Sequence, residues 1–332
     1  MRRNEILRAV VAAAILGGVA ASSAWAADYV QPKTPWGDPD IQGNWPLTHL
    51  NGTPLQRNPK YGDREYLTDA EFAERQKSMA QRGGLYDKEI ETNKIGLGHW
   101  AEFGDANRMT SLIVDPKNGR LPPLTAEGER RSKLMRSSWS SDIVFRDISD
   151  FNVLDRCMTR GMPASMFPFM YNSGVEIHQA PGYVVIRLEI VHETRIIPVD
   201  GRPPLPGAIK QWLGVSRGHW EGNTLVVETT NYTGEAPMTI VGPRSKPIPT
   251  STKLKTVERF TRTGENTLDY TVTVSDPVVM QGSWTAHLPW QRDPTYRIYE
   301  YACHEGNDMI RNYITSFKGV TAAELAKENA KK

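Results

Sequence analysis

The stretch YVVIRLEIVHE, residues 183–193, decides the fold class because apolar and polar side chains alternate along it. Successive side chains of a β-strand point to opposite faces, so this alternation predicts a strand with one buried face. The apolar face holds Val184, Ile186, Leu188, Ile190 and His192. The opposite face holds Tyr183, Arg187, Glu189 and Glu193. We therefore expect a half-buried strand on which His192 is the polar member of the inward face.

Short β-branched and aromatic runs, separated by turn residues, follow this strand along the chain. The expected strands are residues 183–193, 224–232, 254–263, 267–275, 283–291 and 296–303. Consecutive antiparallel strands, about eight or nine in all, are most simply closed into an up-and-down barrel, because closure leaves no exposed edge. Residues 172–317 are thus predicted to form a mainly β, lipocalin-like barrel, with a β-sandwich as the alternative.

Residues 27–171 predict a long irregular arm with short helices, because they are rich in Pro, Gly and charged residues and contain few periodic segments. Thr68 and Glu71 have the spacing of a capping box, which opens a helix ending near Gln81. Thr125 is placed to cap a second helix. The pattern is typical of an arm that wraps over another part of the protein.

Residues 1–26 predict a secretory signal peptide. A start with three arginines precedes an uncharged apolar run at 9–21, and a small-x-small cleavage site ends at Ala26. The run is too short to span a bilayer. The sequence therefore predicts a bacterial periplasmic or secreted protein that has no membrane span after cleavage.

The charge balance points away from nucleic acid. Cleavage would remove three arginines from 40 basic residues and one glutamate from 38 acidic ones, which leaves the mature chain formally neutral. Nucleic-acid binding depends on clustered Lys and Arg, and the small charged tail at 318–332 is no such cluster. No dinucleotide fingerprint, P-loop or haem motif is present, so we expect no cofactor. The oligomeric state is left open.

The chain has two cysteines, Cys157 and Cys303. In an oxidising compartment an isolated pair is typical of a disulfide. Chain-entropy reasoning gives such a long loop roughly 5 kcal/mol as an upper value. Two buried thiols are the alternative.

Five motifs are spread over nearly the whole mature chain. They are TPWGDPDIQGNW at 34–45, TSLIVD at 110–115, HETR at 192–195, WEGNTLVVETTN at 220–231 and EYACHEGN at 300–307. Together they resemble the motifs of a large family of exported bacterial proteins of unknown function. The resemblance implies a bacterial exported protein whose two halves belong together. It implies neither a reaction nor catalytic residues.

His192 and Arg195 are the first candidates for chemistry. An imidazole on the wall of a barrel cavity can act as general base or acid, and a guanidinium beside it can stabilise an oxyanion. The alternative is that His192 is a histidine of the core with satisfied hydrogen bonds.

His304 and Glu305 are the second candidates, since they follow a tyrosine-rich segment and the cysteine at 303. The two histidines would exchange protons with a substrate, and Glu305 would orient one ring. Tyr299 and Tyr301 would contact the substrate. Alternatively, His304 hydrogen-bonds the arm and the tyrosines belong to the core or the outer wall.

Residues 161–170 contain three methionines and two phenylalanines. Adaptable side chains of this type, here Met166 and Phe169, can line the entrance for an apolar ligand. Alternatively, the segment seals the junction between arm and barrel.

Two other kinds of site have weaker support. His192, Glu193, His304 and Glu305 carry metal-binding atoms, but no His-x-His or His-Glu-x-x-His spacing is present, so we predict no metal. The segment GVSRG at 214–218 matches a nucleophile elbow, yet a strand follows it where that motif requires a helix.

Three functions are compatible with these patterns, and whether the protein is an enzyme is left open. The first is an exported, cofactor-independent acid/base enzyme, a hydrolase, lyase or isomerase, acting on a small apolar or aromatic molecule. The second is a non-catalytic, lipocalin-like binding protein of the cell envelope, and the third is a structural protein with a filled interior. Convergence of His192, Arg195 and His304 in one cavity favours the enzyme, whereas an apolar cavity without them favours binding.

Overall fold

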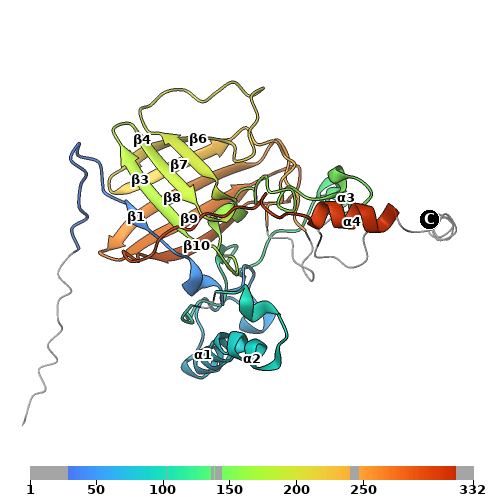
Figure 1. Cartoon of the computed structure of the whole chain (residues 1–332). Helices are drawn as coiled ribbons and strands as arrows, with labels where there is room; N and C mark the ends of the chain where they lie inside the picture. The colour runs from blue at the N-terminus through green and yellow to red at the C-terminus, as the bar shows by residue number, and fades with distance from the viewer. Residues whose placement is uncertain (1–28, 103, 136–137, 139–143, 240–246, 319–332) are drawn as a thin grey trace, which may run out of the picture. The chain divides into compact units, whose positions relative to one another are not determined.

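Two antiparallel β-sheets form the centre of the fold in the computed structural model (Figure 1). The structure describes residues 29–102, 104–135, 138, 144–239 and 247–318. The expected signal peptide at 1–26 and residues 319–332 of the expected tail lie outside the described residues. The elements below belong to the compact unit that begins at Gln31.

The first sheet has four strands in the order β1-β3-β4-β5. Their bounds are β1 Gly43–Asn44, β3 Val175–Ala180, β4 Tyr183–Leu188 and β5 Thr194–Pro198. The second sheet has six strands in the order β2-β10-β9-β8-β7-β6. Their bounds are β2 Ile113–Asp115, β6 Val215–Glu221, β7 Thr224–Thr230, β8 Lys255–Gly264, β9 Thr267–Ser275 and β10 Trp284–Gln291. Every ladder in both sheets is antiparallel, as the sequence predicts.

The core lies between the two sheets. Val184, Ile186 and Leu188 of β4 are buried, as their alternation predicts. They belong to one apolar cluster with inward-facing residues of the second sheet, among them Phe260, Tyr270, Trp284 and Trp290. Trp45 and neighbouring residues of the arm are buried in the same cluster. Arm and sheets therefore share one core.

The strands do not close into a barrel. Strands β5 and β6 are the outer strands of their sheets and contact each other, but no ladder joins them in the described residues. A sandwich of two sheets fits this arrangement, so the sequence alternative describes the fold better than the lipocalin-like barrel. Part of the reason is the segment between these strands, residues 199–214, which contains three prolines and cannot supply a continuous ladder.

Strand β4 ends at Leu188, five residues before the end that its alternation predicts. Residues Ile190–His192 form a short 3-10 turn, and both Val191 and His192 have positive φ angles, of 55° and 41°. This left-handed backbone interrupts the alternation of the strand. The prediction that His192 lies on the buried face was wrong: its side chain is exposed.

In the described residues, four α-helices lie outside the sheets. They are α1 Asp69–Gly83, α2 Leu85–Thr92, α3 Ala126–Leu134 and α4 Met309–Lys318. Thr68 and Glu71 form the predicted capping box, and Thr125 accepts a hydrogen bond from the backbone N–H of Gly128, so both predicted helices are confirmed. The sequence reasoning did not find α2 or α4. No described helix is long and apolar enough to cross a membrane.

Residues 296–303 form no strand, contrary to the prediction. The segment is held by side chains instead, because the buried carboxylate of Glu189 accepts hydrogen bonds from the Tyr296 hydroxyl and from the backbone N–H of Tyr299. The predicted disulfide between Cys157 and Cys303 is present. These contacts replace the strand ladder that the tyrosine-rich pattern indicated.

Candidate functional site

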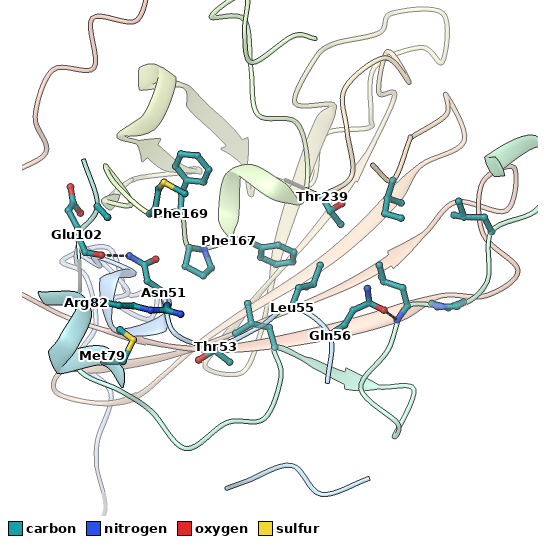
Figure 2. Close-up of a pocket in the computed structure, with 18 of the residues that line it drawn as sticks. Asn51, Thr53, Leu55, Gln56, Met79, Arg82, Glu102, Phe167, Phe169 and Thr239 are labelled. Atoms are coloured by element: carbon teal, nitrogen blue, oxygen red, sulfur yellow. Dashed lines mark hydrogen bonds between the residues drawn. The ribbon is translucent and has the colours of Figure 1, made fainter. Parts of the chain in front are cut away.

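A cavity of about 1060 Å³ lies between the arm and the outer side of the sandwich core (Figure 2). Pockets for small molecules have volumes of roughly 300–1000 Å³, so this one has room for a ligand of several rings or a long chain. Its wall comes from the arm, from α1 and α3, and from the loops before β3 and β8. The residues used below are Asn51, Leu55, Gln56, Arg82, Glu102, Leu112, Leu121, Leu124, Phe167, Phe169, Met170, Thr239 and Ile248.

Most of the cavity wall is apolar. Leu55, Leu121 and Leu124 are half-buried and pack against the main core cluster. Phe167 packs on Trp284 of β10, with ring centroids 6.1 Å apart. The wall is thus the outer surface of a close-packed core, and deleting one of these side chains would also disturb the core.

The segment 161–170 fulfils both functions that the sequence left open. Met166 is buried in the core and does not line the cavity. Phe167, Phe169 and Met170 line it. The guanidinium of Arg160 lies 4.7 Å from the ring centroid of Phe169. This cation–π contact stabilises the position of Phe169 in the wall.

Three polar side chains, Asn51, Arg82 and Glu102, lie at one end of the cavity, which we call its polar end (Figure 2). Gln56 and Thr239 line the cavity further from this end. The Asn51 amide donates to the backbone carbonyl of Glu102 at 2.9 Å, which leaves its Oδ1 atom buried without a hydrogen-bond partner. The Arg82 side chain, from the last turn of α1, extends beneath Asn51. It makes no hydrogen bond or ion pair with any described residue.

The carboxyl group of Glu102 is the titratable acid at this end of the cavity. Burial raises its pKa, and the nearby charge of Glu189 adds to the increase, while a hydrogen bond from the Asn172 backbone N–H opposes it. A protonated carboxyl group is favoured because burial penalises the charged form.

His192 does not line this cavity. Its Nδ1 atom lies 2.7 Å from the backbone carbonyl oxygen of Tyr301. Since a carbonyl only accepts, Nδ1 carries the proton in this contact. The ring fastens the turn after β4 to the segment before the disulfide, which is a structural contact.

His304 and Glu305 are exposed and also lie outside the cavity. In the described part of the chain no hydrogen bond joins Glu305 to either histidine. The structure thus brings His192 close to the tyrosine segment but does not place the two histidines and Glu305 in one enclosed site.

Arg195 is buried between the sheets rather than beside His192. Its Nη1 atom donates to Oε1 of Glu258 in β8 at 2.8 Å, and Nη2 donates to the other oxygen. The hydroxyl of Tyr270 donates to the same carboxylate at 3.0 Å. Burial lowers the pKa of Arg195, but the Glu258 carboxylate raises it by more, so the net shift is upward. A guanidinium paired in this way already has its counter-charge.

Arg195 also lines a second, smaller cavity of about 190 Å³ between β5 and β6, together with Ser216 and Gln211. Its Nε atom has no partner in the described structure. A space of this size holds a few water molecules, which would supply the missing acceptor.

The two tyrosines predicted to contact a substrate are placed differently. Tyr299 is 67 % exposed and does not line the large cavity. Tyr301 is half-buried and stacks on Tyr171, with ring centroids 6.3 Å apart. Of the four residues predicted to bind substrate, Phe169 is the one that lines the large cavity.

No group of three or more His, Cys, Asp or Glu side chains in the described residues is arranged to hold a metal ion. GVSRG at 214–218 leads into β6 and forms part of that strand, so the helix that a nucleophile elbow requires does not follow it.

Sequence reasoning did not find Asn51, Arg82 or Glu102. They lie in three separate segments of the arm and share no motif or periodic pattern. Arg82 carried a local signal because it directly follows the predicted end of a helix near Gln81, and a basic residue there is commonly explained by the helix dipole. No protein-family model matches the chain, and no curated protein matches its sequence.

Proposed function

We propose that this chain is an exported protein that binds a small, largely apolar molecule in the large cavity. The observation that supports binding most strongly is the cavity itself, about 1060 Å³ with a mainly apolar wall and a few polar side chains. This is the usual composition of small-molecule sites. None of His192, Arg195 and His304 lines the cavity.

Export is supported by the signal-peptide pattern at 1–26 and by the disulfide, which is typical of oxidising compartments. Membership of the exported bacterial family stays a prediction from the five motifs. The acid/base enzyme also stays a prediction, because its two histidines lie outside the cavity.

Binding of the neutral dye N-phenyl-1-naphthylamine tests the proposal. The dye is apolar and becomes fluorescent when it leaves water, so a titration gives its affinity and stoichiometry. We expect one site per chain. Substitution Leu55→Trp places an indole in the middle of the cavity and should weaken binding at least tenfold, since the cavity volume is then partly filled.

Leu134→Trp is the matched control, because Leu134 ends α3, is exposed and does not line the cavity. This variant should bind the dye like the wild type. Thermal unfolding of both variants shows whether the sandwich is intact. Equal dye binding by a folded Leu55→Trp variant and the wild type would contradict the proposal.

A further inference from the structure

The polar end of the cavity contains one donor group and one acceptor atom that the protein does not pair. The Arg82 guanidinium has no partner among the described residues, and Oδ1 of Asn51 is buried without one. Buried polar atoms are paired in more than about nine cases in ten, so an orphaned acceptor in a ligand-sized cavity is informative.

Other arginines of the described chain show what this sequence does with a guanidinium. Arg64, near the start of α1, binds both oxygens of Glu71. Arg75, in the middle of α1, donates to the backbone carbonyls of Asn107 and Met109. Arg82, the last residue but one of α1, has no such acceptor and extends into the cavity instead.

An arginine next to an apolar wall favours an anion that presents two oxygen atoms side by side. Guanidinium binds carboxylate or sulfonate oxygens through two parallel hydrogen bonds, and the exposed Arg82 side chain is accessible to such a ligand. Oδ1 of Asn51 has the opposite requirement, because an amide oxygen only accepts and so needs an N–H or O–H from the ligand. Both groups line the same cavity and are drawn close together in Figure 2, so one polar end of a ligand can reach both.

We propose that the ligand is an amphipathic acid. It has an apolar or aromatic body against Leu55 and Phe167, an anionic carboxylate or sulfonate bound by Arg82, and an adjacent N–H or O–H that donates to Asn51. The inference rests on the proposed binding function and names the ligand class of the same cavity.

The carboxyl of Glu102 is the acidic group of this polar end and opposes an anion. One of its oxygens is occupied by the Asn172 backbone N–H, and only its backbone carbonyl contacts Asn51. Glu102 therefore reduces the affinity for an anion without blocking the fork of Arg82.

Two dyes with the same apolar body show how much the charge of a ligand contributes to its affinity, apart from the apolar part. N-phenyl-1-naphthylamine has two aromatic groups and an N–H donor, and 1-anilinonaphthalene-8-sulfonate adds only a sulfonate. We expect Arg82→Gln to weaken binding of the sulfonate dye about tenfold or more, the loss of a charge-assisted hydrogen bond, and to change binding of the neutral dye less than about twofold.

Lys77→Gln is the matched control, since it removes the same charge from the exposed side of α1 and Lys77 does not line the cavity. It should change neither affinity by more than about twofold, because exposed charges at a distance are screened by salt. An equal loss in Lys77→Gln and Arg82→Gln would overturn the inference, since it would show a general field effect.

The hydrogen bond from the ligand to Asn51 is tested with 1-benzylnaphthalene, in which a methylene group replaces the N–H of the neutral dye. Asn51→Ala should weaken the neutral dye several-fold and leave 1-benzylnaphthalene, measured by displacement, unchanged. Equal effects on both compounds would overturn the part of the inference that concerns Asn51.

Failure of the inference and failure of the proposed function give different results. If the neutral dye binds in the cavity and Arg82→Gln leaves the affinity for the sulfonate dye unchanged, the proposed ligand class is wrong and the binding function stands. If neither dye responds to Leu55→Trp, the binding function itself is wrong.

Discussion

Two arginines illustrate two regions of this protein. Arg195, from the HETR motif, is 3 % exposed and holds the Glu258 carboxylate between the sheets. Arg82, from the end of α1, faces a cavity without a partner among the described residues. A charge that already has its counter-charge stabilises a fold, whereas an unpaired charge beside an apolar wall is available to a ligand. The residues of the HETR motif thus make structural contacts, and the polar candidates Asn51, Arg82 and Glu102 lie outside the five motifs.

The HETR motif shows the first case in detail. His192 donates to the Tyr301 carbonyl, and Glu193 accepts a hydrogen bond from the Ser165 hydroxyl at 3.0 Å. Burial raises the pKa of Glu193. Together with Arg195, these residues join the turn after β4 to three other parts of the chain.

Breaking the buried pair should give the largest effect. Glu258→Gln leaves Arg195 buried without its counter-charge, and the loss of unfolding free energy should be about 3–5 kcal/mol, measured by urea unfolding. The control is Glu228→Gln in β7, which removes an exposed partner of Lys255 and should cost less than about 1 kcal/mol. A similar, small cost for both variants would contradict a structural role for the pair.

The second prediction concerns the pH dependence of stability. The raised pKa of Glu102 means that the folded state holds this proton more tightly than the unfolded state, whose pKa is near 4.5. Stability from this group is therefore present below pH 4.5 and is lost as the pH rises through the folded pKa.

Glu102→Gln should remove this contribution and so raise stability at neutral pH relative to the wild type. The measurement is urea unfolding at a series of pH values for both proteins. The difference between the two curves isolates Glu102, because Glu193 and Asp155, whose pKa values burial also raises, are present in both. If the difference in unfolding free energy between the two proteins is the same at every pH, folding does not raise the pKa of Glu102, and the prediction is wrong.

The smallest effect is expected at His304. Its side chain is exposed and lies outside the cavity, so His304→Ala should change the unfolding free energy by less than about 0.5 kcal/mol. The affinity for N-phenyl-1-naphthylamine should be the same as in the wild type. A marked loss of dye binding in this variant would contradict the prediction and show that the C-terminal segment contributes to the binding site.

The sequence predicted well what depends on local pattern. The capping box of Thr68 and the hairpin of β8 and β9 have signals within a few residues, and both are present. The pair Cys157 and Cys303 was predictable because no other cysteine competes for it.

The predictions that failed concern features that depend on contacts between distant segments. Nothing in the alternation at 183–193 shows that the backbone turns at Val191, because the turn is held by Tyr301 and by contacts of Glu189 with the segment at 296–299. The sequence did not predict the cavity for the same reason, since Asn51, Arg82 and Glu102 come together only in the folded chain.

A crystal structure of the protein with N-phenyl-1-naphthylamine tests the central claim most directly. We expect the dye in the large cavity, with its rings between Leu55 and Phe167 and its N–H directed at Oδ1 of Asn51. An empty cavity, with the dye on the exposed aromatic residues Tyr86 and Trp100 or between β5 and β6, would contradict it.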